Sequence, residues 1–367
     1  MHLTSLRLEH FRNHTMTFLE PGEGLNVFLG HNAQGKTNLL EALYLLTCPR
    51  PFRSLKLDEH IQWGESQTRV SGRVVDRSGL TSELSLVLKP GSRVTRRDGK
   101  VVKSLSDLSQ TIRAVLFVSR DLEMVRGTPA GRRRFFDRMI TVAFPQYDEL
   151  LQSYGRVLAQ KAALLAQAAP SGADLDIWNR PLAHLGARLV LTRERFIHYI
   201  LPHLQAHFLR LSGNPAPLTL QLVSTTGASG VRSDAIEGAL LELLERRAAD
   251  ECRAGRPLAG PHRDDFRVEL DGRDLAHFGS QGQTRMLVLS LKMAELVMVR
   301  ELHGVPPLFL LDDVSSELDE EKTSWMLRLL EESGCQIFLT TARYDPLLDH
   351  TLRLRRIFRV QDGRIST

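Results

Sequence analysis

The sequence predicts an α/β fold in which a parallel sheet and an antiparallel meander are interrupted by an inserted, mainly helical second lobe. Three observations predict it. Short apolar runs alternate with helical patterns at both ends of the chain, which is typical of parallel strands covered on both faces. Period-two alternation over residues 67–103 indicates antiparallel strands, and helical spacing dominates residues 129–210.

The beginning of the chain fits this prediction element by element. Residues 3–18 alternate apolar and polar side chains, which predicts two short strands joined by a turn at residues 12–14. A turn at residues 21–24 precedes a short apolar strand over residues 25–29. Apolar residues with helical spacing follow from Leu39 to Leu46, so the order here is strand, loop, helix.

The meander over residues 67–103 is predicted from its alternation and from turn residues at 76–79 and 97–100. A short apolar strand follows over residues 115–118. The helical pattern after it is broken at Pro170–Gly172. The remaining predicted elements are a strand at 218–223, a helix at 235–252, a helix at 283–300, a strand at 308–311, a helix at 321–332 and a strand at 336–339. We therefore expect one α/β domain made of residues 1–125 and 255–367, with a helical insertion over residues 126–254.

Composition and charge exclude several classes of protein. The chain has 367 residues, 42% of them hydrophobic, which excludes collagen-like and disordered classes and predicts two or three domains. Its three cysteines form no CxxC pair, so neither a disulfide framework nor a zinc ribbon is expected. No signal peptide or membrane span is visible, so we expect a cytoplasmic protein without a membrane partner. The net charge of +5 is weak evidence for a polyanionic partner.

A phosphate-binding loop follows the strand at residues 25–29. The segment matches G-x-x-x-x-G-K-[ST] and consists of Gly30, His31, Asn32, Ala33, Gln34, Gly35, Lys36 and Thr37. Its glycines allow backbone N–H groups to point at phosphate oxygens, and the following helix directs its positive dipole end there. Lys36 is expected to reach the β- and γ-phosphates, and Thr37 to offer its hydroxyl to Mg²⁺. The motif therefore predicts a nucleotide such as ATP, with Mg²⁺.

The strand at residues 308–311 ends in two acids, as a Walker B motif does. Ligands bind at the carboxyl ends of parallel strands, so these acids are expected at the nucleotide site. Asp312 would hold Mg²⁺, and Asp313 would orient or deprotonate the attacking water, which makes Asp313 and Lys36 the predicted catalytic residues. Glu317 and Asp319 follow at once in a Ser-Glu-Leu-Asp run and are predicted D-loop residues.

A third segment lies at the start of the helix predicted at residues 283–300. Its predicted signature residues, Ser280, Gln281, Gly282 and Gln283, combine an N-cap with a second anion site. Together with both Walker motifs, the segment resembles the signature motif of ABC-type ATPases. That resemblance implies an ABC-type P-loop ATPase head whose signature serine binds, in trans, the γ-phosphate held by a partner protomer. Dimerisation would then complete the site.

The chain as a whole resembles the RecF family of SMC-related ATPases. The matching segments run in the family's order and are residues 11–13, 32–42, 131–137, 260–265, 280–283 and 311–314. The Gly-Pro-His-Arg-Asp-Asp block at residues 260–265 is the most diagnostic of them. The resemblance places Arg12 and Asn13 among the nucleotide-binding residues. It implies a weak DNA-dependent ATPase that forms an ATP-dependent homodimer on duplex DNA near single-strand gaps, and that works with RecR and RecO in loading RecA.

The chain departs from the family pattern at two places. Residues 119–122 read Ser-Arg-Asp-Leu where the family usually has Pro-Glu-Asp-Leu, and no Q-loop glutamine stands there. After the strand at residues 336–339, Thr340 and Thr341 are followed by Ala342 rather than by a third threonine. The switch histidine of transporters is absent, which leaves Thr341 as the switch candidate.

Two basic clusters are candidates for DNA contact. One surrounds a predicted hairpin and contains Arg93, Arg96, Arg97 and Lys100; the other starts the helical insertion and contains Arg132, Arg133 and Arg134. Such clusters give salt-sensitive affinity for phosphates without sequence preference. A solvated surface or pairing within the protein is the alternative interpretation of each cluster. Because no groove-reading motif is present, any specificity should be for DNA structure, including duplex/single-strand junctions.

Two alternative functions remain open at this point. A nucleotide-binding subunit of a membrane transporter would have a shorter distance between its Walker motifs, a Q-loop glutamine and a switch histidine. Here Lys36 and Asp312 lie 276 positions apart. A nucleotide-gated DNA clamp with negligible turnover is the second alternative, against which Asp313 argues.

Overall fold

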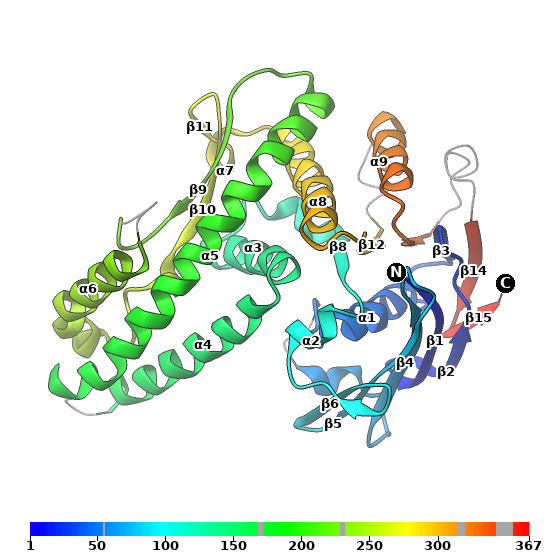
Figure 1. Ribbon diagram of the computed structural model, residues 1–367, viewed down its shortest axis with the longest axis horizontal. Helices are drawn as coiled ribbons and strands as arrows, with labels where there is room; N and C mark the ends of the chain where they lie inside the picture. Colours follow the sequence, from blue (N-terminus) through cyan, green and yellow to red (C-terminus); the bar gives the residue numbers. More distant parts are fainter. Residues whose placement is uncertain (54–55, 168–171, 228–231, 314–319, 343–354, 367) are drawn as a thin grey trace. The chain divides into compact units, whose positions relative to one another are not determined.

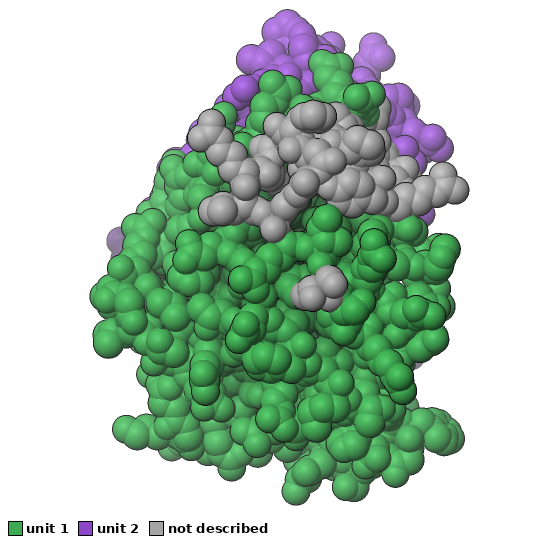
Figure 2. Space-filling view, turned by 90° about the vertical axis from the view of Figure 1, so that its right-hand side faces the viewer, with its two compact units in different colours: residues 1–121, 292–367 green, residues 122–291 purple. Residues whose placement is uncertain are grey.

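The computed structural model describes residues 1–53, 56–167, 172–227, 232–313, 320–342 and 355–366. The chain forms two compact units, coloured separately in Figure 2. Unit 1 consists of residues 1–121 and 292–367, and unit 2 of residues 122–291. In the described residues no helix combines the length and the apolar character that crossing a membrane would require.

Unit 1 contains a six-stranded antiparallel sheet in the order β2-β1-β4-β5-β6-β7. Its strands are β1 (His2–Phe11), β2 (His14–Leu19), β4 (Thr68–Val75), β5 (Thr81–Lys89), β6 (Ser92–Arg97) and β7 (Lys100–Val101). The predicted N-terminal strand pair and the predicted meander are thus one sheet, because β1 pairs with β4 in the register Leu8↔Val70. Alternation along β1 buries Leu6 and Leu8 and leaves Arg7 between them exposed.

A second six-stranded sheet in unit 1 has the order β15-β14-β3-β13-β12-β8. Its strands are β3 (Leu25–Leu29), β8 (Ala114–Val118), β12 (Leu308–Asp312), β13 (Ile337–Thr341), β14 (Arg355–Gln361) and β15 (Arg364–Ser366). All neighbours from β14 to β8 are parallel, and β15 returns antiparallel to β14. Because parallel strands end at one edge, β3, β12 and β13 bring Leu29, Asp312 and Thr341 to the same edge of the sheet.

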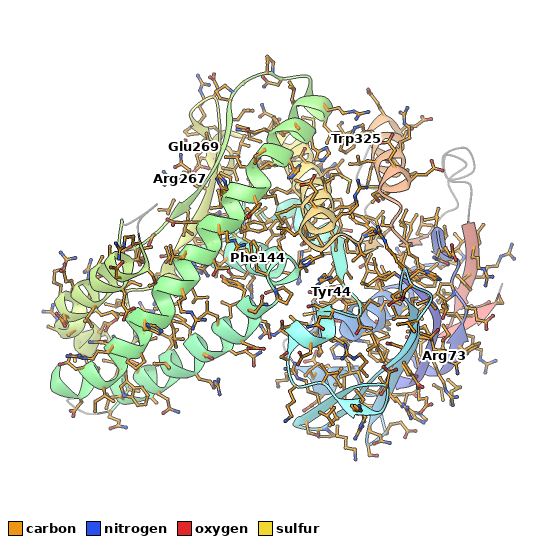
Figure 3. All side chains as sticks on the ribbon, in the orientation of Figure 1. Tyr44, Arg73, Phe144, Arg267, Glu269 and Trp325 are labelled. Atoms are coloured by element: carbon orange, nitrogen blue, oxygen red, sulfur yellow. The ribbon has the colours of Figure 1, made fainter. Side chains whose placement is uncertain are left out.

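Helix α1 (Lys36–Thr47) packs against both sheets of unit 1 (Figure 1). Its residues Leu39, Leu40 and Leu43 are fully buried in a core that also includes side chains from β1, β4 and β12. Tyr44, labelled in Figure 3, meets Phe52 edge-on with ring centroids 5.6 Å apart. The helix is therefore fixed along its length, and so is the loop that enters it. Unit 1 also contains the helices α2 (Leu105–Ser109) and α9 (Glu320–Ser333).

Unit 2 combines long helices with a three-stranded antiparallel sheet in the order β11-β10-β9. Its elements are α3 (Pro129–Ala143), α4 (Gln146–Leu165), α5 (Gly172–Ser212), β9 (Leu218–Val223), α6 (Ser233–Ala254), β10 (Asp265–Leu270), β11 (Arg273–Asp274) and α7 (Leu275–Phe278). Phe136 of α3 stacks on Phe266 of β10, with ring centroids 4.3 Å apart. This contact joins the helices to the sheet.

A buried ionic network crosses the core of unit 2. Arg193 of α5 donates hydrogen bonds to the carboxylates of Asp137 and Asp264 and to the carbonyl of Pro261. Asp264 is fully buried and also accepts the backbone N–H of Thr225 at 2.9 Å. The Gly-Pro-His-Arg-Asp-Asp block at residues 260–265 therefore ties α3, α5 and β10 together, which is a structural reason for its presence.

The unit boundaries differ from the predicted domain boundaries at the second junction. The structure divides at 121/122 and 291/292, whereas the sequence suggested 125/126 and 254/255. Residues 255–291 join unit 2 because β10 pairs along its whole length with β9, in the register Val268↔Leu220. The boundary at 291/292 falls inside helix α8 (Gln281–His303), where no turn residue marks it. Unit 2 is also less purely helical than the predicted insertion.

Candidate functional site

The side chain of Lys36 folds back onto the start of the phosphate loop in unit 1. Gly35 is the N-cap residue of α1 with φ 109°, a conformation that glycine adopts without strain. The Nζ of Lys36 donates hydrogen bonds to the carbonyl oxygens of Gly30 at 2.6 Å and His31 at 2.8 Å. Burial lowers the pKa of Lys36, and the nearby carboxylates of Asp313 and Asp312 oppose this shift. A positive charge is therefore held inside the loop, at the place where phosphate groups are expected.

The two Walker motifs meet through a short hydrogen bond. The hydroxyl of Thr37 donates to Oδ1 of Asp312 at 2.8 Å, across 275 positions of sequence. Both side chains carry oxygen atoms that could bind a metal ion, and neither side chain is completely buried. The pair that the sequence predicts to hold Mg²⁺ is therefore brought together.

Asp313 follows β12 with a left-handed backbone, φ 50°. Its N–H donates to the hydroxyl of Thr340 at 3.0 Å, so its main chain is fixed next to the loop. The predicted D-loop residues Glu317 and Asp319 lie outside the described residues.

Thr340 and Thr341 have different roles at the end of β13. Thr340 is fully buried, and its hydroxyl donates to Oδ1 of Asp312 at 2.8 Å. The switch candidate Thr341 is also buried, and its carbonyl accepts the N–H of Gly30 at 3.3 Å. Sequence analysis missed Thr340. The register of two adjacent parallel strands, which pairs Asp312 with Thr340, is the signal that could have found it.

The β1–β2 turn supports the loop from one side. The side chain of Asn13 donates to the carbonyl of Gln34 at 3.1 Å and accepts from the side chain of Asn38 at 2.7 Å. A Cβ at Gly35 would lie 2.6 Å from Nδ2 of Asn13, so this close approach requires glycine. Asn13 thus contacts the phosphate loop directly, and its role in nucleotide binding stays a prediction.

Arg12 points in another direction. Its Nη2 lies 2.9 Å from the carboxylate of Glu41, which is completely buried on α1. Burial disfavours the ionised form of Glu41, but the hydrogen bond from His60 and the charges of His60 and Arg12 outweigh it, so the pKa of Glu41 lies below its usual range. In this structure Arg12 therefore anchors α1.

Ser119 lies where no Q-loop ligand could be assigned from the sequence. Its hydroxyl is 3.2 Å from the carbonyl oxygen of Asp312 and 3.3 Å from that of Asp313. Next to it, Arg120 donates to the carbonyl of Phe52 at 2.6 Å. The Ser-Arg pair therefore holds the end of β12 and the chain after α1.

The predicted signature segment lies in unit 2 and forms a capping box. The hydroxyl of Ser280 accepts the N–H of Gln283 at 3.1 Å, and the side chain of Gln283 accepts the N–H of Ser280 at 2.8 Å. Gln281 begins α8, and a Cβ at Gly282 would meet only Oγ of Ser280, at 3.9 Å. The helix start is therefore stable and open above Gly282.

Comparison with known proteins decides the family. The model of the RecF/RecN/SMC N terminal domain matches residues 2–366. A DNA replication and repair protein RecF from Thermosynechococcus vestitus is 38% identical over 374 residues, covering 100% of this chain and 97% of the relative. The RecF of Geobacter sulfurreducens is 36% identical over 368 residues, with both chains fully covered. This chain belongs to the RecF family.

Solved structures agree with the family assignment. The recombination mediator protein RecF-ATPrS in the RecFOR pathway matches with a TM-score of 0.90 and 28% identity, covering 100% of this chain and 97% of that one. An SmcHead bound to the C-winged helix domain of ScpA matches with a TM-score of 0.56 and 12% identity, which shows the fold alone. The predicted ABC-type ATPase fold and the RecF resemblance are confirmed.

The basic clusters of this RecF-family chain differ in how their side chains are engaged. Arg132 forms two hydrogen bonds with the carboxylate of Asp265, at 2.5 and 2.8 Å, and Arg133 donates to the carbonyl of Asp264 at 2.6 Å. Arg134, between them and Phe135, is exposed. The first two arginines therefore hold the Asp264–Asp265 segment, and Arg134 remains the DNA candidate of this cluster.

The hairpin cluster is less engaged. Arg93 donates to the carbonyl of Pro49, and Arg97 donates to the hydroxyl of Thr111 at 3.0 Å. Arg96 is half-buried, whereas Lys100, at the hairpin turn, is exposed. Arg93 is exposed in spite of its hydrogen bond. Positive charge therefore reaches solvent mainly at Arg93 and Lys100.

Proposed function

We propose that this RecF-family chain binds Mg·ATP at the phosphate loop and hydrolyses it slowly as part of a DNA-repair cycle in the cytoplasm. The Thr37–Asp312 hydrogen bond carries the proposal, because it joins the two predicted Mg²⁺ ligands, which lie 275 positions apart in the sequence. Relatives described as RecF with ATP or ATPrS support the choice of nucleotide.

The residues present fit Mg²⁺. The hydroxyl of Thr37 and the carboxylate of Asp312 are hard oxygen donors 2.8 Å apart, and Mg²⁺ takes such donors together with waters and substrate phosphates. These two side chains would hold the ion. When bound, Mg²⁺ supplies positive charge that neutralises the β- and γ-phosphate oxygens.

The chain's own groups perform the remaining tasks. The backbone N–H groups at the start of α1 and the ammonium of Lys36 bind and orient the phosphates, because both direct positive charge at the same point. Asp313 orients the attacking water and accepts its proton, since it follows β12 directly and its carboxylate is near enough to Lys36 to act on the pKa of that lysine. Thr340 keeps Asp312 and the backbone of Asp313 in place.

The signature segment supports a composite site in a homodimer. Ser280 caps α8, whose open N-terminus at Gly282 suits a γ-phosphate presented by a partner copy. Dimerisation would then depend on ATP, and hydrolysis would release the dimer. The exposed Arg93, Lys100 and Arg134 suit the backbone of duplex DNA near single-strand gaps. Cooperation with RecR and RecO in loading RecA is the biological role that we propose with it.

Sedimentation with and without ATP and duplex DNA tests this proposal. We expect a monomer alone, a dimer with Mg·ATP, and the dimer on DNA only when ATP is present. Lys36→Arg is the control, because a planar guanidinium cannot replace the ammonium between two loop carbonyls. A parent protein that remains monomeric with ATP and DNA would contradict the composite site. The alternative of a clamp with negligible turnover is distinguished by measuring phosphate release from the DNA-bound dimer.

A further inference from the structure

The β14–β15 hairpin contacts the phosphate loop at both of its ends. At the start of the loop, a Cβ on Gly30 would overlap the carbonyl oxygen of Val360 on β14. Near its end, the carbonyl of Gln34 accepts the N–H of Gly363 at 3.0 Å, and the side chain of Gln34 accepts the N–H of Asp362 at 2.7 Å. Figure 1 shows β14 and β15 beside β3 and β2. The hairpin therefore lies against the loop near both ends of the loop.

A buried histidine makes a second connection between the same two segments. His14 is completely buried, with Nδ1 2.8 Å from the carbonyl of Gly363 and Nε2 3.1 Å from the carbonyl of Gly35. Burial lowers the pKa of His14, although both carbonyls oppose the shift. The neutral ring has one N–H, so it donates to one carbonyl and lies in contact with the other. The hydroxyl of Thr17 also donates to the carbonyl of Gly363, at 3.2 Å.

We propose that the turn of the β14–β15 hairpin, through Gln34 and His14, is a positioning element that holds the phosphate loop in the shape that binds ATP. This inference rests on the proposed function of the loop and adds a second support to it. The loop has to keep its N–H groups aimed at one point before the nucleotide arrives, and preorganisation of this kind raises affinity without a new ligand contact. No residue of the hairpin itself needs to touch ATP.

The chain contains a matched control for this idea. Two hairpins have Asp-Gly turns with nearly the same backbone: Asp98 and Gly99 have φ of 50° and 76°, and Asp362 and Gly363 have φ of 48° and 73°. Alanine at either glycine carries the same conformational cost. A Cβ at Gly99 meets nothing within 4 Å, whereas a Cβ at Gly363 would overlap the backbone of Asn13. Only the second substitution forces the β14–β15 turn and the backbone of Asn13 apart.

The experiment measures ATP binding with Mg²⁺ by isothermal titration calorimetry on the full chain, at a temperature where circular dichroism shows each variant to be folded. Gly363→Ala should bind ATP about tenfold more weakly than Gly99→Ala, which should bind like the parent. Asparagine tolerates positive φ but still has a Cβ. Gly363→Asn should therefore also bind ATP weakly, and Gly99→Asn should bind ATP with the affinity of the parent. Equal affinity in the matched pair would overturn the inference.

Two further variants keep the result decisive. Gln34→Ala removes only the acceptor of the Asp362 N–H. If Gly363→Ala does not fold, this variant tests the inference in its place, and an unchanged affinity of Gln34→Ala for ATP would overturn it. Lys36→Arg reports on the proposed function itself. If it binds ATP like the parent, the loop is not the ATP site and the proposed function fails. If it loses ATP while Gly363→Ala retains it, only the positioning role fails.

Discussion

The hydroxyl of Thr340 donates a 2.8 Å hydrogen bond to the carboxylate of Asp312. The same hydroxyl accepts the N–H of Asp313 at 3.0 Å, and Asp312 receives a second hydrogen bond from Thr37. One buried side chain on β13 thus fixes the carboxylate of Asp312 and the backbone of Asp313 and, through Asp312, contacts the first turn of α1. The geometry of the nucleotide site therefore depends on a residue that need not touch the nucleotide.

Thr340→Val tests this relationship. Valine has nearly the shape of threonine but no hydroxyl, so the Asp313 N–H loses its acceptor, at a cost of about 1–3 kcal/mol. We expect kcat for ATP hydrolysis to fall about tenfold while the Kd for ATP changes little, because the hydrogen bonds of Lys36 are intact. Thr340→Ser keeps the hydroxyl and should restore turnover. Normal turnover in the valine variant would contradict the positioning role.

Asp313→Asn should separate binding from hydrolysis. Thr37, Lys36 and Asp312 remain, so Mg·ATP should bind with its normal affinity. The amide cannot accept the proton of water, so turnover should fall by about 10²–10⁴-fold, and the dimer should persist longer on DNA. Phosphate release and dimer lifetime are the two measurements, and the parent rate in the variant would remove Asp313 from the catalytic role.

Ser280→Arg tests whether the signature acts across a dimer. The substitution removes the N-cap of α8, at a cost of about 1 kcal/mol, and places a bulky cation at the helix start. The monomer should bind ATP but fail to dimerise. Mixing with Lys36→Arg should restore about one composite site per heterodimer, measured as ATP-dependent association of differently labelled chains. If mixing restores nothing, while each variant is folded, a site in trans is excluded.

The basic cluster on α3 predicts two different phenotypes. Arg134→Glu should weaken duplex binding and lower the salt slope by about one unit for each lost phosphate contact, with unchanged thermal stability. Arg132→Ala removes the two hydrogen bonds that Arg132 donates to the carboxylate of Asp265, so the free energy of unfolding should fall by about 1–3 kcal/mol. Salt-dependent DNA titrations and thermal melts measure the two effects. The same DNA defect in both variants would mean that Arg132 also contacts DNA.

His262 predicts a loss of stability in acid. Burial, with the positive charges of Arg263 and Arg133, lowers the pKa of His262 to about 4. Below about pH 6.5, His262 is protonated in the unfolded chain but stays neutral in the native protein. The free energy of unfolding therefore falls as the pH drops from 6.5 towards 4. At pH 5 the effect is about 1–2 kcal/mol. His262→Asn should lose less stability than the parent between pH 7 and 5, as measured by denaturant unfolding.

Much of this fold could be predicted because its strands carry strong local signals. The apolar run of β12 and the glycine pattern around Lys36 are both visible within a short stretch of sequence. The hairpin of β14 and β15 was missed because four arginines interrupt its apolar residues, and its burial depends on pairing with β3. Burial set by pairing with a distant strand leaves a weak local pattern.

The candidate site shows the same division. Lys36, Thr37 and Asp312 are named by motifs, since phosphate and metal binding need fixed residue types at fixed spacing. Thr340, Ser119 and His14 each contact two main-chain or carboxylate groups of remote segments. Many residue types could make such bonds, so no pattern marks them. Arg12 illustrates the converse, because its motif position did not disclose the ion pair with Glu41.

The place of β3 in its sheet also has a consequence during synthesis on the ribosome. Its two partners, β13 and β14, start roughly 310 and 330 positions after it, which at translation rates of about 5–20 residues per second means a wait of tens of seconds or more. All strands of the antiparallel sheet lie within residues 2–101, as does helix α1. This sheet can therefore pair early in synthesis. Until β13 emerges, however, β3 is an apolar strand with both edges open, which is the kind of segment that chaperones bind and that aggregates when they do not.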